Sequence, residues 1–171
     1  FKVKGSSAAT YFLGENSGLP LESEDKIETV PDAQVIFIEL GLNEVEFGSS
    51  VPTGETAYSR MLDAIRAASP DVPIVVSRPP RTAKHCTNAT SLNNKVENIA
   101  EYLKNYCSTH DKFTYVDTVS CLFDSEKNLK SEWASTDGFH ITGSESYATW
   151  VKEIEKSLKT AVGDTNGASP S

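Results

Sequence analysis

Three short apolar runs do most to limit the folds that this chain can adopt. These runs are rich in β-branched and aromatic residues. They are "AQVIFIEL" (33–40), "PIVVS" (73–77) and "FTYVD" (113–117). A turn signal, Gly41, follows the first run, and Pro79 and Pro80 follow the second. The runs are continuously apolar rather than alternating, which is typical of strands buried on both faces of a parallel sheet.

Stretches with apolar residues at helical spacing separate and follow these strands. Their apolar positions are Tyr58, Met61, Leu62, Ile65 and Ala68, then Leu92, Val96, Ile99, Leu103 and Tyr106, and finally Tyr147, Trp150, Val151, Ile154 and Leu158. This alternation predicts an α/β fold, a three-layer α/β/α sandwich with a mostly parallel, flavodoxin-like sheet of about five strands. We expect one domain over residues 1–162 and a small, polar, disordered tail over 163–171.

Composition argues against several classes of function. The formal net charge of -8 disfavours binding to nucleic acid, whose phosphates require Lys and Arg. No apolar run approaches the roughly 18 residues of a membrane span. His85 and Cys86 are adjacent and His110 stands alone, so the histidines and cysteines lack the spacing of metal ligands, and we expect no metal site. Cys86, Cys107 and Cys121 either include one disulfide or are three small apolar thiols.

The stretch "STDGFHITGSESYATW" (135–150) holds the residues best suited to chemistry. Asp137 and His140 are three residues apart in a tight loop, so the carboxylate can reach the imidazole. Such a contact fixes the tautomer of the ring and makes its other nitrogen a general base. The alternative is an aspartate that caps a turn beside a surface histidine. A helix is expected to follow, with Thr142 and Glu145 as its capping box.

Two further residues directly follow predicted strands. Asn43 lies in "ELGLNEV", where a side-chain amide could donate to a developing oxyanion, or could simply tolerate a turn. Gly5 lies in "VKGSSAAT", where a backbone N–H could approach a ligand closely, or the glycine could only end a strand. Taken alone, Asn43 and Gly5 each favour the structural interpretation. The stronger signal is the order in which the segments with Gly5, Asn43 and the Asp137–His140 pair follow one another along the chain.

In this order the segments resemble the SGNH (GDSL-type) hydrolase family, whose four sequence blocks supply Ser, Gly, Asn and His. "VKGSSAATYF" is similar to the Gly block, "ELGLNEV" to the Asn block and "STDGFHITGSESYATW" to the His block. The resemblance extends from Phe1 to about Leu158. It departs from the usual Asn block at Leu42 and Glu44, neither of which has a catalytic role in the family.

The resemblance implies a role for each candidate residue. His140 would be the catalytic base and Asp137 the acid that orients it. Asn43 and Gly5 would donate hydrogen bonds to the oxyanion.

The serine block of the family should lie upstream of the Gly block. We therefore expect the nucleophile to precede Phe1, with Ser7 in "GSSAAT" as the fallback within this sequence. "GSSAAT" lacks the acidic residue of the usual G-D-S, which favours the first interpretation. A missing N-terminal strand would leave strand edges unpaired, so a further N-terminal segment or a partner chain is expected to complete the sheet.

The resemblance implies a serine esterase or acyl hydrolase without a cofactor. Its expected substrate is a small ester or an acylated carbohydrate, from which it removes an O-acyl group of the acetyl type. The alternative is a catalytically dead SGNH-like module that binds a carbohydrate or other ligand in the same place. Export in the family, together with the sequon "NAT" at 88–90, leads us to expect an extracellular or cell-surface location.

Overall fold

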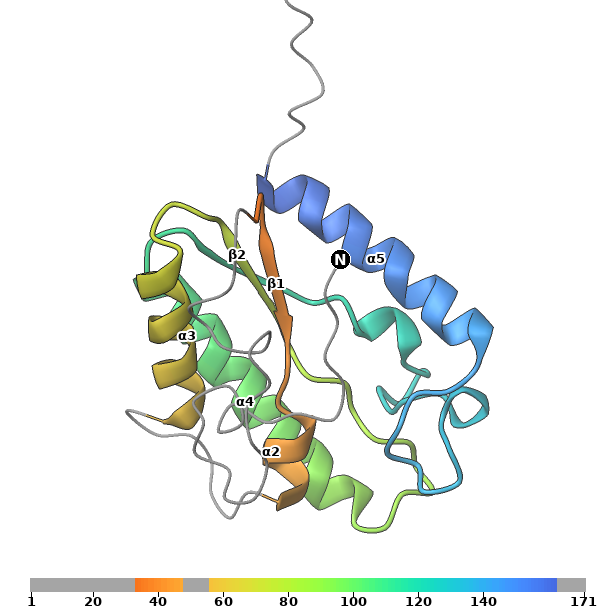
Figure 1. Ribbon diagram of the computed structural model, residues 1–171. Coiled ribbons are helices and arrows are strands. Elements are labelled where there is room, and N and C mark those ends of the chain that lie inside the picture. The colour runs from red at the N-terminus through yellow and green to blue at the C-terminus, as the bar shows by residue number, and fades with distance from the viewer. Residues whose placement is uncertain (1–32, 48–55, 163–171) are drawn as a thin grey trace, which may run out of the picture.

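The computed structural model describes residues 33–47 and 56–162, which form a parallel sheet flanked by helices (Figure 1). In chain order the elements are β1 (Ile36–Glu39), α2 (Leu42–Phe47), α3 (Ala57–Ala68), β2 (Ile74–Ser77), α4 (Ala89–Thr109), β3 (Phe113–Val116), the 3-10 helices η3 (Ser120–Leu122) and η4 (Ser131–Trp133), and α5 (Ser144–Val162). The predicted tail at 163–171 lies outside the described residues.

All three predicted strands belong to one sheet. β2 lies between β1 and β3 and pairs with both in parallel, so that Ile74 is aligned with Ile36 on one side and with Phe113 on the other. The predicted α/β class with a parallel sheet is confirmed. Because parallel strands end at the same edge of a sheet, the segments that follow β1, β2 and β3 are brought together there.

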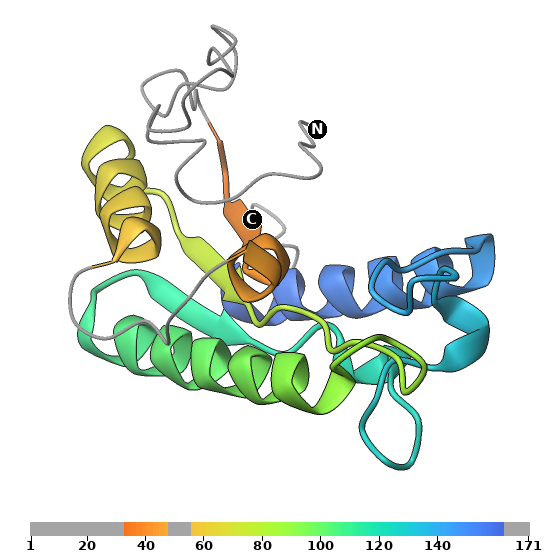
Figure 2. The same cartoon turned by 90° about the horizontal axis from the view of Figure 1, so that it is seen from below.

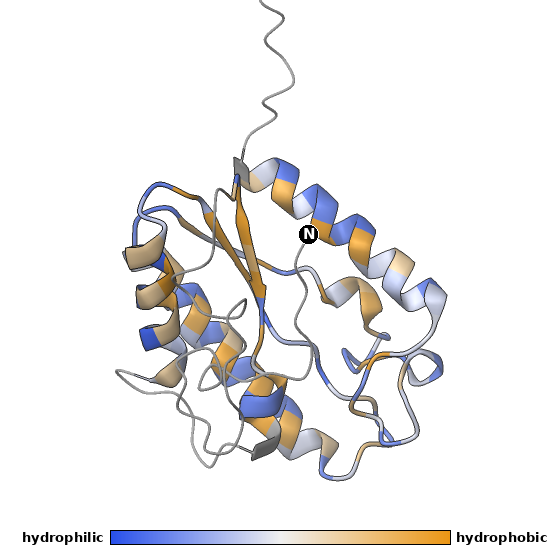
Figure 3. Cartoon of the chain, in the orientation of Figure 1, coloured by the Kyte–Doolittle hydropathy of each residue, from blue (hydrophilic) through white to orange (hydrophobic). Residues whose placement is uncertain are grey.

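The main core lies between the sheet and helices α3 and α4, which cover one of its faces (Figures 1 and 2). Its most buried members, each at most 1% exposed, are Val45, Met61, Leu62, Ile74, Val76, Val96 and Leu103. Figure 3 shows apolar residues along the strands and on the inner sides of these helices. The helical spacing predicted for 58–65 and 92–106 therefore describes a core face, whereas Ala68, the last position predicted for the first of these helices, is exposed.

On its other face, β2 is connected to α5 through polar side chains. Side chains alternate along a strand, so Ser77 points away from Ile74 and Val76. The Ser77 hydroxyl lies 2.8 Å from the Thr118 hydroxyl, which in turn accepts a hydrogen bond of 3.2 Å from the Trp150 indole on α5. Helices thus lie on both sides of the strands, as Figure 1 shows for α3 and α5.

Helix α5 differs from its prediction in two respects. Tyr147 and Val151 are 48% and 50% exposed, so the predicted apolar stripe is only partly covered within the described part of the chain. The predicted capping box is wrong, because the helix begins at Ser144 and the residue before it is Gly143 rather than Thr142. The hydroxyl of Ser146 lies 2.6 Å from the Gly143 carbonyl oxygen and makes the bond back to the start of the helix.

The cysteines are thiols, with no disulfide among the three. Burial raises the pKa of Cys107 to about 11, so its thiol stays protonated and packs as a small apolar group in the core. Over the described ranges, no helix combines the length and the apolar character needed to span a bilayer.

Candidate active site

Asp137 and His140 form a direct pair. The Oδ2 atom of Asp137 lies 2.8 Å from Nδ1 of His140, the contact that their spacing predicted. The side chains are 51% and 59% exposed, so the pair stands at the surface. Among the residues that the structure describes, none makes a hydrogen bond with Nε2 of His140, which leaves that nitrogen available to a reacting group.

Several donors converge on the Asp137 carboxylate. Its Oδ1 atom accepts hydrogen bonds from the hydroxyl of Ser135, from the backbone N–H of Phe139 at 2.7 Å and from that of His140 at 3.2 Å. These bonds, led by the one from Ser135 and followed by those from Phe139 and His140, hold the pKa of Asp137 well below its usual range. The carboxylate therefore remains ionised wherever the histidine can act as a base.

A tight turn of the backbone creates this arrangement. The N–H of Gly138 donates to the Ser135 carbonyl at 2.9 Å, and the N–H of Ser135 donates to the His140 carbonyl at 2.8 Å. Gly138 adopts a φ of +72°, a conformation that glycine enters without steric cost. The four residues 135–138 thus turn the carboxylate back toward the histidine.

The loop that carries this pair rests on the connection between β2 and α4. The N–H of Ala83 donates to the Gly138 carbonyl at 2.8 Å, and Nε2 of His85 lies 3.0 Å from the Ser135 carbonyl. An ideal Cβ on Gly138 would lie 2.6 Å from the Cys86 backbone nitrogen, so the two segments are in close contact. The site is therefore built by the β2–α4 connection as well as by the loop itself.

Asn43 lies in the first turn of α2, directly beyond the carboxyl end of β1, and it is half-buried. The preceding Gly41 has a φ of +121° and packs against Pro79, to which an ideal Cβ would approach within 3.2 Å. The β2–α4 connection thus contacts the Asn43 segment at its start and the His140 loop further along. Gly5 and Ser7 lie outside the described residues, so their predicted roles stay predictions.

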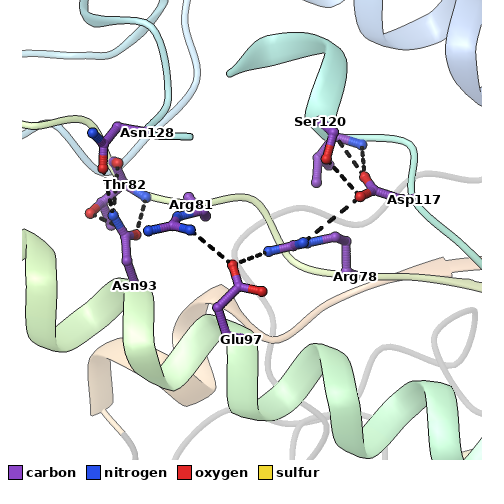
Figure 4. Close-up of polar contacts among 9 residues, drawn as sticks. Arg78, Arg81, Thr82, Asn93, Glu97, Asp117, Ser120 and Asn128 are labelled. Atoms are coloured by element: carbon purple, nitrogen blue, oxygen red, sulfur yellow. Dashed lines mark hydrogen bonds and ion pairs between the residues drawn. The ribbon is translucent and has the colours of Figure 1, made fainter. Parts of the chain in front are cut away.

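The sequence reasoning missed a polar network that joins the β2–α4 connection to α4 (Figure 4). Glu97 on α4 accepts hydrogen bonds from Arg78 at 2.6 Å and from Arg81 at 3.1 Å. A second guanidinium nitrogen of Arg78 lies 3.8 Å from Asp117, which follows β3. The arginines are the first charged residues after β2, and this position at the carboxyl end of a strand could have pointed to them in the sequence. The network ties the β2–α4 connection to α4 and to the end of β3.

Of the predicted site contacts, the structure shows the one between Asp137 and His140. A family model described as the GDSL-like Lipase/Acylhydrolase family matches residues 5–144, which is most of the chain. The chain belongs to this family. The match includes the candidate residues Gly5, Asn43, Asp137 and His140 of this GDSL-like chain.

Solved structures similar to this GDSL-like chain agree with the fold. A protein from Streptococcus pneumonia described as a platelet activating factor is 19% identical with a TM-score of 0.64, over 74% of this chain and 60% of that one. A carbohydrate esterase family 3 protein from Talaromyces cellulolyticus is 19% identical with a TM-score of 0.59, over 82% and 63%. A peptidoglycan O-acetylesterase is 15% identical with a TM-score of 0.55, over 81% and 41%.

At these identities the likeness establishes the fold alone. The chain spans less than two thirds of the length of each of these three structures. The search of curated proteins gave no match. Over the described ranges, no group of three or more His, Cys, Asp or Glu side chains could hold a metal ion.

Proposed function

We propose that this chain forms the histidine-bearing part of a serine esterase that removes an O-acyl group, of the acetyl type, from a carbohydrate or a small ester. The observation that carries the proposal is the Asp137–His140 pair, with 2.8 Å between Oδ2 and Nδ1 and with no hydrogen bond between Nε2 and any described residue. Membership of the GDSL-like acylhydrolase family supports the same chemistry.

In the proposed mechanism, Asp137 accepts the Nδ1 proton of His140 in a hydrogen bond and so directs the lone pair of Nε2 outward. Nε2 removes the proton from a serine hydroxyl as its oxygen attacks the acyl carbonyl carbon. The imidazolium then passes that proton to the departing alcohol oxygen, and the acyl-enzyme remains. Water attacks the acyl-enzyme after losing a proton to Nε2, and the acid is released as the serine regains the proton.

The negative charge of each tetrahedral intermediate is stabilised by hydrogen-bond donors. We assign this role to the side-chain amide of Asn43 and to the backbone N–H of Gly5. A donor of this kind is worth roughly 3 kcal/mol in the transition state. The position of Asn43 at the carboxyl end of β1 supports the assignment, since ligands of parallel α/β sheets bind at that edge.

The substrate class is supported by two structural neighbours and by the exposure of the site. The carbohydrate esterase and the peptidoglycan O-acetylesterase share the fold, and their names point to acyl groups carried on sugars. His140 is 59% exposed in its side chain, which suits an acyl group presented on a bulky, hydrated alcohol. A long fatty acyl chain would instead require apolar surface to cover it.

The proposal is tested with the full-length protein on 4-nitrophenyl acetate, 4-nitrophenyl palmitate and an O-acetylated oligosaccharide. We expect the acetyl substrates to be preferred, His140→Ala to lower kcat by about 10⁴-fold or more, and Asp137→Asn to lower it by about 10² to 10⁴-fold. The matched control is His110→Ala, which changes an exposed histidine at the end of α4.

Two results would contradict the proposal. Activity that persists in His140→Ala would remove the histidine from the mechanism. No turnover of any ester, together with saturable binding of the acetylated oligosaccharide that Asn43→Ala and His140→Ala both weaken, would identify a binding module that has lost catalysis.

A further inference from the structure

Asn93 is a fully buried polar residue on the sheet-facing side of α4. Its exposed fraction is 2%, and it lies one helical turn before Val96 of the main core. A polar side chain at such a position costs free energy unless its hydrogen bonds are made. The contacts of Asn93 therefore indicate why it is there.

Every hydrogen-bonding group of the Asn93 amide is used, and three of its four bonds go to one residue. Oδ1 accepts from the Thr82 N–H at 2.8 Å and from the Thr82 hydroxyl at 3.1 Å. Nδ2 donates to the Thr82 carbonyl at 3.3 Å and to Oδ1 of Asn128 at 3.2 Å. Figure 4 shows the amide facing Thr82, with Asn128 beyond it. One side chain thus fixes both backbone polar groups of Thr82.

Thr82 is directly joined to the residue that holds the His140 loop. It is 0% exposed, and so is Ala83, whose N–H donates to the Gly138 carbonyl at 2.8 Å. Gly138 lies between Asp137 and His140 in the chain. The path from Asn93 to the Asp137–His140 pair therefore consists of adjacent peptide groups and direct hydrogen bonds, mostly away from water.

We propose that Asn93 is a positioning residue for His140. It fixes Thr82 and Ala83, which hold the Gly138 carbonyl and thereby the turn that brings Asp137 onto the imidazole. The inference rests on the proposed function of His140 as a base. Arg78 and Arg81 also attach this connection to α4 through Glu97, but they do so from partly exposed side chains at its start.

The proposal predicts that a change at Asn93 lowers kcat even when the variant is folded. Without the amide, Thr82 loses three hydrogen bonds, and the turn at Gly138 is free to shift relative to Asn43. A misplacement of about 1 Å in a catalytic group can lower a rate by about 10²-fold. We expect Asn93→Ala to lower kcat by about 10- to 100-fold, with KM changed by less than about threefold.

The test combines kinetics of the full-length protein with nuclear magnetic resonance of its histidine side chains. Since the chain has three histidines, the His140 Nδ1 proton is assigned by its disappearance in His140→Ala. We expect this signal to be sharp in the wild type and broadened or lost in Asn93→Ala at a temperature where the variant is folded. Asn94→Ala, at the exposed neighbouring position of α4, is the matched control and should change neither readout.

The outcomes separate this proposal from the proposed function. A wild type that hydrolyses no ester, but loses the Nδ1 signal in Asn93→Ala, would retain the positioning role and refute the esterase. An active wild type with kcat and Nδ1 signal unchanged in a folded Asn93→Ala would overturn the positioning role. If Asn93→Ala does not fold, Asn93→Asp decides, because it keeps the side-chain shape and removes both donations from Nδ2, including the one to the Thr82 carbonyl. A kcat and signal equal to wild type in Asn93→Asp would then overturn the proposal.

Discussion

Two hydrogen-bonded clusters lie on either side of the Gly138 carbonyl, and they differ mainly in their access to water. The Asn93–Thr82 cluster has exposed fractions of 2% and 0%, whereas the side chains of Asp137 and His140 are 51% and 59% exposed. A buried hydrogen bond cannot be replaced by water when it is broken, so its loss costs the full desolvation of its groups. In an exposed pair, water takes over the same bonds at little cost.

This difference in exposure matches a difference in proposed role: the buried Asn93–Thr82 cluster holds the loop in place, and the exposed Asp137–His140 pair reacts. A histidine that exchanges protons with a substrate must be reachable, and an exposed pair contributes little to the stability of the fold. Its geometry must then be imposed from elsewhere, and the buried cluster does this through two adjacent peptide groups. We therefore expect changes on the exposed side to affect activity alone, and changes at the junction to affect both activity and stability.

Asn43→Ala tests the reactive side of this comparison, at a half-buried residue beside the start of the β2–α4 connection. Loss of the side-chain donor is expected to lower kcat by about 10²- to 10³-fold with little change in KM, since the bond forms in the transition state. The melting temperature should stay close to that of the wild type, because among the described residues no hydrogen bond engages this amide. Asn98→Ala, at an exposed position of α4, is the control for stability. An unchanged kcat would remove Asn43 from the oxyanion site.

Gly138→Ala tests the junction itself. The added Cβ would lie 2.6 Å from the nitrogen and 2.7 Å from the Cα of Cys86, both backbone atoms that cannot turn aside. The φ of +72° adds a penalty of about 1 kcal/mol or more. We expect the loop to shift, kcat to fall by up to about 10²-fold and the melting temperature to fall with it.

Gly143→Ala is the matched control for this variant. Gly143 has a φ of +92°, but its nearest neighbour to an added Cβ is the Ser146 hydroxyl at 3.9 Å. Gly143→Ala therefore has the free-energy cost of a positive φ without the steric clash. Equal kcat values for the two variants would show that the contact with Cys86 does not position the His140 loop.

The elements that could be predicted are those in which pattern and environment agree. The run at 73–77 is apolar on both faces because all four residues of β2 are buried, whereas β1 and β3 are mostly half-buried and Thr114 of β3 is exposed. The periodicity of α3 and α4 follows their buried faces. Asp137 and His140 could be paired from spacing alone, since a separation of three residues in a tight turn brings the carboxylate within reach of the imidazole.

The elements that were missed depend on contacts between distant segments. The apolar stripe of α5 predicts which side chains share a face, but not how much of that face is covered, and Tyr147 is half exposed. Asn93 is a polar residue at a core position of α4. Its departure from the apolar spacing of that helix could have marked it in the sequence. Its partner Thr82 lies 11 residues away, in a segment without periodicity. The catalytic roles of Asn43 and Gly5 remain predictions.

A carboxylate at the end of β1 gives the comparison its last and smallest test. Burial, reinforced by the nearby charge of Glu44, raises the pKa of Glu39 to about 8, whereas the donors around the exposed Asp137 lower the pKa of that residue. Between the unfolded pKa of about 4.5 and the folded pKa of about 8, the unfolded chain binds fewer protons, so stability falls as pH rises.

Glu39→Gln removes this titration, because the amide stays neutral at every pH in that window. We expect the difference in unfolding free energy between the variant and the wild type to grow from pH 5 to pH 8, by at most about 1.4 kcal/mol for each pH unit. Chemical denaturation across this range measures it, with the exposed Glu101→Gln on α4 as control. If the two stability curves ran parallel, Glu39 would be ionised in the folded protein, and the strand end would be as accessible to water as the Asp137–His140 pair.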